Sequence, residues 1–215
     1  MHRYLVTGTD TDVGKTRITA ALALALKRGG IAPTIVKVVQ TGLPSGTPGD
    51  AARAGKLAGV RFVELARFQK PADPWSAALA AGQLEVHAGE LVDAMAPITK
   101  GLVAEGAGGI MVQLNSREHF GHVAHLGKLE VIIVVGLRLG CLNHAMLTVS
   151  KCQQMGLPVA GAVLVERWGP MDAAYRRDVI RTLQGKLKIF GIVPFSEDEA
   201  QSVEQASRLF DDLVR

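Results

Sequence analysis

Residues 8–16 read Gly-Thr-Asp-Thr-Asp-Val-Gly-Lys-Thr, and this segment lies between two contrasting patterns. Before it comes a short apolar run, Tyr4–Thr7, typical of a buried strand, and after it a helical pattern over Lys15–Lys27. A loop between a strand and a helix presents backbone N–H groups to an anion, at the helix end whose dipole carries about half a positive charge. The segment therefore predicts a phosphate-binding loop.

Three residues at the end of this loop supply the chemistry that a nucleoside triphosphate requires. Gly14 lets the backbone approach the phosphates, and Lys15 can reach the β- and γ-phosphate oxygens. The Thr16 hydroxyl can ligate Mg²⁺. The spacing departs from the common Gly-x-x-x-x-Gly-Lys-Thr motif, because Thr9 stands where the first glycine would fall. The loop predicts a triphosphate site but does not choose among the many classes of NTPase.

Short apolar runs alternate with helical patterns along the whole chain. The expected strands are Tyr4–Thr7, Thr34–Val39, Gly101–Ala104, Val131–Val135, Val159–Val165 and Leu187–Ile192. The expected helices are Lys15–Lys27, Asp50–Leu57, Glu90–Met95, Asn143–Gln154, Met171–Leu183 and Glu197–Leu213. This alternation predicts a doubly wound α/β fold of the P-loop NTPase type, with a mostly parallel sheet and helices on both faces. No linker or repeat interrupts it, so residues 1–215 are expected to form a single domain.

Composition excludes several classes of protein. Of the 215 residues, 48% are hydrophobic and 20% charged, which excludes a disordered chain. The net charge is only +4 and no run of Lys or Arg exceeds two, so neither a nucleic acid nor a membrane partner is expected. Two cysteines, Cys141 and Cys152, cannot form a disulfide framework, and the N-terminal segment lacks the apolar core of a signal peptide. We expect a cytoplasmic protein in which both thiols pack in the interior.

A second lysine stands near the end of an expected strand. Lys37 opens the segment Lys-Val-Val-Gln-Thr-Gly, residues 37–42, in which Thr41 offers a hydroxyl donor. Ligands of open parallel sheets gather beyond the carboxyl ends of the strands. Although a lysine at a strand end is more often solvated, this one would form a cationic pocket together with Lys15, able to hold an anionic intermediate.

Two carboxylates are candidates for binding a metal ion. Glu105, in the segment Ala-Glu-Gly-Ala-Gly-Gly of residues 104–109, follows an expected strand and suits Mg²⁺ ligation opposite Thr16. Asp50 could be a helix N-cap or a second Mg²⁺ carboxylate, and the spacing does not decide between them.

Three histidines recur at intervals of three residues, namely His119, His122 and His125. On a helix, His119 and His125 would diverge by about 120°, and Gly121 weakens the helix. No cysteine or carboxylate completes a zinc-binding set. A cluster on the surface is therefore the favoured interpretation.

Taken together, the motifs resemble a known family. The segments at residues 8–16, 37–42 and 104–109, with Val-Val-Gly-Leu-Arg-Leu-Gly-Cys-Leu-Asn-His-Ala-Met-Leu-Thr at 134–148, are similar to those of dethiobiotin synthetases, in the same order and spacing. The resemblance extends from Arg3 to about Phe195. The segment at residues 134–148 is the most specific of these, because P-loop ATPases in general do not require it.

The resemblance implies an enzyme of biotin biosynthesis, a ligase that forms carbon–nitrogen bonds. Its substrates would be 7,8-diaminononanoate, CO₂ and ATP, with Mg²⁺. One amine captures CO₂ as a carbamate, whose oxygen attacks the γ-phosphate to give a carbamic–phosphoric anhydride. The second amine closes the ureido ring and expels phosphate. Charge neutralisation and positioning should dominate catalysis, and no general base is assigned.

The resemblance also implies roles for individual residues. Lys37 and Lys15 would be catalytic, with Lys37 in the place of the family's active-site lysine. Thr16, Asp50 and Glu105 would hold Mg²⁺. The nucleotide would contact Asp12, Val13, Gly14, Lys15, Thr16, Arg17, Asp50, Glu105, Gly106, Ala107, Gly108, Glu166, Arg167, Val193, Pro194 and Phe195. The diamine would contact Thr11, Lys37, Thr41, Leu139, Gly140, Cys141, Leu142, Asn143 and Tyr175.

The family's substrate site lies across a homodimer interface. By resemblance, the loop Leu139–Asn143 of one subunit would meet the substrate carboxylate in the other, and Tyr175 would contact the same carboxylate. One departure concerns the nucleobase. Glu166 and Arg167 stand where the family often has Asn-Asp to read adenine, which leaves the preference for ATP over other triphosphates open.

Two other interpretations share the fold. A switch ATPase that positions chromosomes or division septa usually carries an additional lysine early in the phosphate loop, where this chain has Thr9-Asp10-Thr11. Its membrane-binding members end in a basic amphipathic helix, whereas residues 197–212 here are rich in Asp and Glu. An amidating synthetase of the cobyrinate type needs a glutaminase domain, for which 215 residues leave no room.

Overall fold

A computed structural model describes residues 2–83 and 85–214 of the chain. Its central feature is a seven-stranded sheet in the order β4-β2-β6-β1-β7-β8-β9, in which every neighbouring pair is parallel. The strands are β1 (Arg3–Gly8), β2 (Thr34–Lys37), β4 (Arg61–Glu64), β6 (Leu102–Gly109), β7 (Glu130–Gly136), β8 (Val159–Val165) and β9 (Ile189–Val193). Two short strands, β3 (Gln40–Thr41) and β5 (Arg67–Phe68), pair separately. The predicted doubly wound sheet is confirmed.

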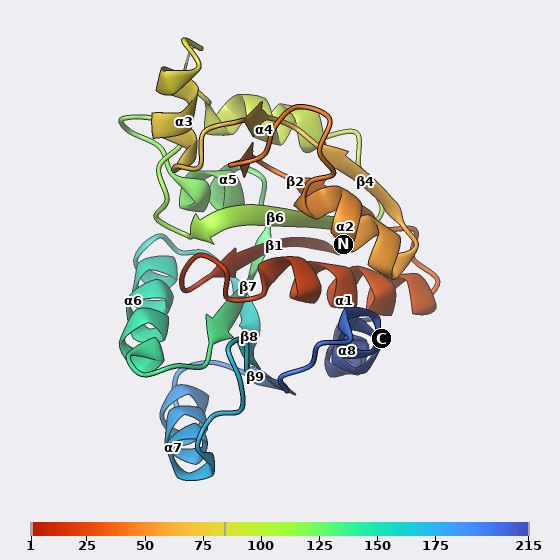
Figure 1. Ribbon diagram of the computed structural model, residues 1–215, viewed down its shortest axis with the longest axis vertical. Helices are drawn as coiled ribbons and strands as arrows, with labels where there is room; N and C mark the ends of the chain where they lie inside the picture. Colours follow the sequence, from red (N-terminus) through yellow and green to blue (C-terminus); the bar gives the residue numbers. More distant parts are fainter. Residues whose placement is uncertain (1, 84, 215) are drawn as a thin grey trace.

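Helices cover both faces of this sheet (Figure 1). One face carries α1 (Lys15–Arg28), α2 (Asp50–Ala58) and α8 (Glu199–Ser207). The other carries α3 (Pro74–Ala80), α4 (Ala88–Met95), α5 (Phe120–Leu126), α6 (Cys141–Gln154) and α7 (Ala173–Gln184). After α8 the chain ends in a 3₁₀ turn (Arg208–Phe210) and α9 (Asp211–Val214). No helix in the described ranges combines the length and the apolar character needed to span a bilayer.

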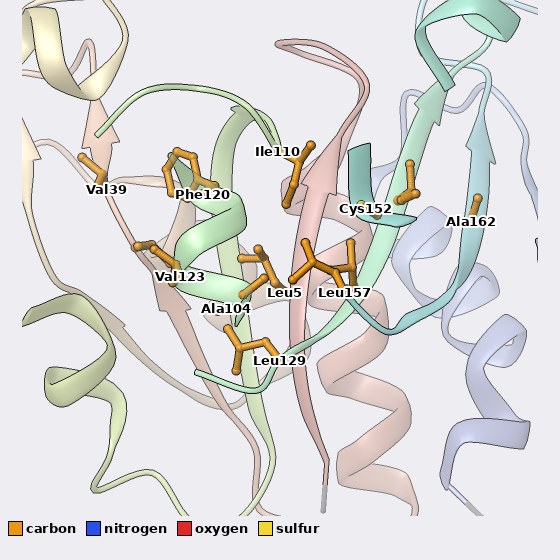
Figure 2. Packing of buried hydrophobic residues seen from close by; sticks show 14 of the residues in the cluster. Leu5, Val39, Ala104, Ile110, Phe120, Val123, Leu129, Cys152, Leu157 and Ala162 are labelled. Carbon is orange, nitrogen blue, oxygen red and sulfur yellow. The ribbon is translucent and has the colours of Figure 1, made fainter. Parts of the chain in front are cut away.

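The inner strands of the sheet are apolar on both sides, so they contribute to two cores. In β1, Leu5 packs into the core beneath α5 and α6, while Tyr4 and Val6 pack into the core beneath α1. Figure 2 shows Leu5 with Phe120 and Val123 of α5 in the first of these cores. Each fully buried side chain of this size stabilises the fold by about 2 kcal/mol. Double-sided burial explains why these strands read as continuous apolar runs.

The structure corrects several predicted boundaries. The strand predicted over Thr34–Val39 ends at Lys37. The strand predicted to end at Ala104 continues to Gly109, so Glu105 lies within β6. The helix predicted over Glu197–Leu213 is divided into α8, a 3₁₀ turn and α9. Strands β3, β4 and β5 and helices α3 and α5 were not predicted, because their sequences are short or carry charged and exposed residues.

The prediction of a surface histidine cluster is wrong for His119. This residue is 6% exposed and caps α5: its Nδ1 accepts a hydrogen bond of 3.1 Å from the Gly121 N–H. His122 completes a reciprocal capping pair, because its Nδ1 accepts a hydrogen bond of 3.1 Å from the His119 N–H. His125 is exposed, as predicted. Both free cysteines, Cys141 and Cys152, are buried in the core, also as predicted.

Because all seven strands run in the same direction, their carboxyl ends share one edge. The register pairs Lys37 of β2 with Glu105 of β6, and Glu105 in turn with Val6 of β1. The phosphate loop leaves β1 at that same edge. Strand register therefore brings a lysine, a carboxylate and the loop together across segments about 100 residues apart in sequence.

Candidate active site

The phosphate loop joins β1 to α1, and its conformation depends on glycine. Gly14 is the N-cap of α1 with φ +100°, in the left-handed region. A Cβ there would also lie 3.2 Å from the Val165 side chain at the end of β8. Val13 is buried and anchors the loop to the core beneath α1. The exposed backbone N–H groups of the first helical turn therefore open toward the edge of the sheet.

Lys15, the first residue of α1, lies largely buried at this edge. Its ammonium donates a hydrogen bond of 3.0 Å to the Asp10 carbonyl oxygen. Burial and then the positive charge of Lys37 lower the pKa of Lys15 to about 8, against the opposite effect of the nearby carboxylates. An anion bound beside Lys15 would stabilise its charge, which is the electrostatic condition for a phosphate site.

Lys37 ends β2, and its side chain is only 3% exposed. The ammonium lies 2.8 Å from Glu105 Oε1 and 2.7 Å from Asp50 Oδ2, and it donates to the Gly106 carbonyl oxygen at 3.1 Å. Burial disfavours the charge of this lysine, but Glu105 and Asp50 outweigh burial and raise its pKa above the ordinary value. Lys37 is therefore held as a cation in a fixed direction.

Asp50 is not a helix N-cap, which was one of its two predicted roles. Gly49 occupies the cap position, and Asp50 is the first residue of α2. Its carboxylate turns instead toward Lys37. The N–H of Asp50 donates a 2.9 Å hydrogen bond to the side-chain oxygen of Gln40.

The donor set at this edge fits Mg²⁺. Thr16 Oγ1 donates a 3.0 Å hydrogen bond to Glu105 Oε1, while Glu105 Oε2 is buried and has no hydrogen-bond partner among the described residues. The Asp50 carboxylate is the second one at this edge, because it contacts the same Lys37 ammonium as Glu105 does. Within the described ranges, no cluster of three or more His, Cys, Asp or Glu residues could form an all-protein metal site. Mg²⁺ characteristically uses one or two carboxylates together with substrate phosphates.

These side chains line one cavity of about 300 Å³. It brings together ten of the sixteen residues predicted for the nucleotide, namely Asp12, Gly14, Lys15, Thr16, Arg17, Asp50, Glu105, Ala107, Gly108 and Arg167. Of the nine residues predicted for the diamine, three line it: Thr11, Lys37 and Thr41. Three further lining residues were not predicted, namely Gln40, Arg53 and Glu199. The two lysines therefore face the same enclosed space, as an anion-binding site requires.

Comparison with known proteins identifies the family. A family described as "AAA domain" matches residues 2–202. The chain is 39% identical over 170 residues to the ATP-dependent dethiobiotin synthetase of Rhodococcus jostii, covering 76% of this chain and 73% of that protein. It is 40% identical over 185 residues to that of Mycobacterium avium, covering 80% and 79%. The chain belongs to the dethiobiotin synthetase family.

Solved structures of low identity share the fold. The cell division ATPase MinD of Pyrococcus furiosus has a TM-score of 0.61 at 17% identity and covers 99% of this chain and 100% of its own. A ParA-family ATPase of Chlorobium tepidum has a TM-score of 0.57 at 17% identity, with 99% and 93% covered. These likenesses confirm the P-loop NTPase-like architecture. Sequence, in contrast, places the chain among dethiobiotin synthetases.

Some residues that the dethiobiotin synthetase resemblance assigned to the nucleotide lie outside the cavity lining. They are Val13, Gly106, Glu166, Val193, Pro194 and Phe195. Glu166 is buried, and its carboxylate accepts from Arg176 Nη1 at 3.0 Å and from two backbone N–H groups, of Met171 and Phe195. Its oxygens are thus engaged by the protein itself. Arg167, which does line the cavity, pairs with Asp12 at 3.1 Å.

The residues assigned to the substrate carboxylate also lie outside the cavity of a single chain. Leu139 is 89% exposed, and Gly140 begins α6 in the left-handed conformation. Tyr175 of α7 lies beside this group, close to Cys141 and to the backbone of Gly140. Burial, followed by the neighbouring Cys141 side chain, raises the pKa of Tyr175. The loop over residues 139–143 and Tyr175 therefore lie together at the start of α6, with Leu139, Gly140 and Asn143 exposed and Cys141 buried.

Of the three cavity residues that sequence reasoning missed, two carried a signal. Gln40 lies inside the motif that contains Lys37 and Thr41. Arg53 follows Asp50 by three residues, which places both on one face of α2. Glu199 gave no signal: it comes from the start of α8, 146 residues after the Arg53 with which it pairs at 2.8 Å.

Proposed function

We propose that this chain converts 7,8-diaminononanoate, CO₂ and ATP into dethiobiotin, ADP and phosphate, as a carbon–nitrogen cyclo-ligase of biotin biosynthesis. Family membership supports the reaction. The observation that carries the proposal is the convergence of Lys15 and Lys37 with the carboxylates of Asp50 and Glu105 on one cavity beside the phosphate loop. Free, buried Cys141 and Cys152 suit a cytoplasmic location.

The phosphate loop would bind the triphosphate of ATP. Backbone N–H groups at the start of α1 and the Lys15 ammonium face the position that the phosphates would take. Arg17 of α1 lines the same cavity, as do Arg53 of α2 and Glu199 of α8, which form an ion pair. Because Lys15 lies buried without an ion-pair partner among the described residues, its charge is available to the β- and γ-phosphates.

Lys37 would bring the second anion to the first. One amine of the substrate adds to CO₂ and loses a proton, which gives a carbamate. A carbamate oxygen then attacks the γ-phosphorus, ADP leaves, and a carbamic–phosphoric anhydride forms. The Lys37 ammonium would neutralise the carbamate and the transferring phosphoryl group, since it is fixed between β2 and β6 before substrate binds. The second amine attacks the anhydride carbon, closes the ring and releases phosphate.

Thr16, Asp50 and Glu105 would hold Mg²⁺. When bound, this ion would supply positive charge that offsets the negative charge of the phosphates. The buried Glu105 Oε2, which has no hydrogen-bond partner in the described part of the chain, supports this assignment. Thr11 and Thr41, which line the cavity, would orient the diamine.

We further propose that the active form is a homodimer. Leu139 and Leu147 are exposed apolar side chains on and beside α6, and Met111 is a third nearby. Leu147 and Met111 line a hollow of about 410 Å³ that adjoins the phosphate loop at Thr9 and Asp10. A second copy over this face would place its residues 139–143 beside the substrate. Sedimentation equilibrium should then give twice the chain mass of 22.8 kDa.

A product assay tests the proposed reaction. The protein is incubated with the diamine, bicarbonate, Mg²⁺ and each of ATP, GTP, CTP and UTP in turn, while dethiobiotin and phosphate are measured together. We expect dethiobiotin and phosphate in equal amounts, and phosphate release only when the diamine is present. Phosphate release that does not depend on the diamine would instead support the switch ATPase. The series also tests base preference, which the engaged carboxylate of Glu166 leaves open.

A further inference from the structure

A single arginine outside the cavity holds the loop that leads into α2. Arg67 of β5 donates through Nε and Nη2 to both carboxylate oxygens of Glu64, at 2.5 and 2.9 Å. Its Nη1 donates to the carbonyl oxygens of Pro44 and Thr47, at 3.0 and 2.9 Å. One planar guanidinium thus ties the end of β4 to two points of the loop over residues 42–49. A point charge such as an ammonium could not reproduce this fork.

The same loop makes a second close approach just before α2. A Cβ on Gly49 would lie 2.5 Å from Glu64 Oε2 and 2.9 Å from both Arg67 Nη2 and Gln40 Oε1. Gly49 has φ −89°, an ordinary value, so the limit is space and not backbone strain. The backbone at this point passes directly over the Arg67–Glu64 pair. Gln40 Oε1 then accepts the first N–H of α2, from Asp50.

Apolar packing does not hold this loop in place. Residues 44–48 are exposed, and burial resumes only at Gly49. At its start, the Gly42 N–H donates to the carbonyl oxygens of Phe68 and Lys70, both at 3.1 Å. Beyond that point, the position of the loop depends on the hydrogen bonds from Arg67 and on the contact between Gln40 and Asp50. Asp50, at the end of the loop, carries the carboxylate that lies 2.7 Å from Lys37 Nζ. A shift of the loop would move this carboxylate directly.

We propose that Arg67 is a positioning residue that sets Asp50 against Lys37 by holding the loop over residues 42–49, with Gln40 completing the connection. Arg67 does not line the cavity and touches no reacting group. Its effect on turnover rests on the proposed function, whereas its effect on the loop does not. Residues that orient active-site ligands from behind commonly change activity by about 10- to 100-fold when they are removed.

The test compares Arg67→Ala with Arg28→Ala, which removes an exposed ion pair with Glu204 between α1 and α8. In Arg67→Ala we expect the turnover number to fall about 10- to 100-fold, with the affinity for metal-free ATP unchanged because Lys15 and the phosphate loop keep their positions. Arg67→Lys should be nearly as impaired as Arg67→Ala, and free guanidinium ion should restore part of the activity of Arg67→Ala. Arg28→Ala should match the wild-type protein. Wild-type turnover in Arg67→Ala would overturn the proposal.

Hydrogen exchange provides a readout that needs no substrate. In Arg67→Ala, the amides of residues 42–53 should exchange faster, while those of α1 keep their wild-type rates. Unchanged exchange at Asp50 would refute the positioning role even if activity fell. If the wild-type protein made no dethiobiotin, the proposed function would fail, yet this exchange experiment would still test Arg67.

A second pair of variants tests the close approach of the loop to Arg67 at Gly49. Gly49→Ala inserts a methyl group against Glu64, Arg67 and Gln40, whereas Gly89→Ala inserts one into open space on α4. We expect Gly49→Ala to reproduce the turnover defect and the faster exchange of Arg67→Ala, and Gly89→Ala to show neither. Equal turnover and exchange in the two glycine variants would contradict the proposal.

Discussion

The two lysines of the cavity lie in opposite electrostatic surroundings. Lys37, at the end of β2, contacts two carboxylates, and its pKa is raised. Among the described residues, Lys15, at the start of α1, donates only to a backbone carbonyl, and burial together with the charge of Lys37 lowers its pKa to about 8. Both side chains are buried and both face the same space. The difference between them lies in which charges the protein itself supplies.

This contrast separates two tasks within one site. The charge of Lys37 is compensated inside the protein, so its ammonium is fixed in place before any ligand arrives and can act on the reacting atoms. The charge of Lys15 lacks a carboxylate at contact distance among the described residues, so an incoming polyphosphate is its natural partner. Lys15 should therefore govern nucleotide affinity, and Lys37 should govern the chemical step.

Removal of Lys37 should have the largest effect. In Lys37→Ala, product formation should fall by at least about 10³-fold, as expected when a preorganised donor to a developing charge is lost. Nucleotide affinity, measured by titration calorimetry, should stay near the wild-type value. Lys37→Gln provides a check against misfolding, because its amide can still hydrogen-bond Glu105. Ring closure at the normal rate in either variant would show that Lys37 has no part in the chemistry.

Removal of Lys15 should act on binding. Lys15→Ala should weaken ATP binding about 100-fold, the loss expected for two charge-assisted hydrogen bonds. Lys27→Ala is the matched control, because Lys27 lies near the other end of α1 and donates to the Gly59 carbonyl oxygen. Calorimetry on the two variants measures the difference. Equal ATP affinities in Lys15→Ala and Lys27→Ala would show that Lys15 does not govern nucleotide binding.

The lowered pKa of Lys15 predicts a pH dependence of binding. Below pH 8 the free protein already carries the Lys15 charge, so the affinity for metal-free ATP should change little. Above pH 8 a proton must be taken up on binding, and the affinity should fall by about tenfold per pH unit. Titrations between pH 7 and 9.5 measure this slope, which Lys15→Ala should lack. A flat profile in the wild-type protein would contradict the low pKa.

His119 shows what burial does to a base with no carboxylate beside it. Burial, then His122 and Lys151, lower its pKa to about 4. In the unfolded chain His119 binds a proton near its ordinary pKa of 6.5, so its contribution to stability is complete above pH 6.5 and is lost as the pH falls toward 4. We expect a loss of about 2 kcal/mol between pH 7 and 5. The free energy of unfolding in urea, measured at pH 7 and at pH 5, gives this loss. In His119→Asn, which retains a capping side chain, the contribution of residue 119 to the loss should be absent.

Much of the site could be predicted because parallel strands align their ends. The pattern at residues 8–16 fixed the loop, and Lys37 and Glu105 each stood at the end of an apolar run. Once β2 and β6 are neighbours, the register places these two residues side by side. Local sequence therefore indicated both the residues and the edge at which they meet.

The elements that were missed depend on tertiary contacts. Strand β4 is exposed and carries Arg61 and Glu64, so its sequence lacks the apolar signature of a buried strand. Helix α5 begins at a buried histidine cap, which is not a typical capping residue. The contacts of Arg67 with Pro44 and Thr47 join segments about 20 residues apart that show no shared pattern. Such features follow from packing and could not be read from periodicity.

The central claim is that a carbamate oxygen reaches the γ-phosphorus between the two lysines. Freshly dissolved C¹⁸O₂ tests it directly in a single short incubation with the diamine, ATP and Mg²⁺, followed by mass spectrometry of the phosphate and the dethiobiotin. We expect one ¹⁸O atom in the released phosphate and one in the ureido carbonyl of each ring formed. Phosphate without ¹⁸O, accompanied by labelled dethiobiotin, would contradict the account.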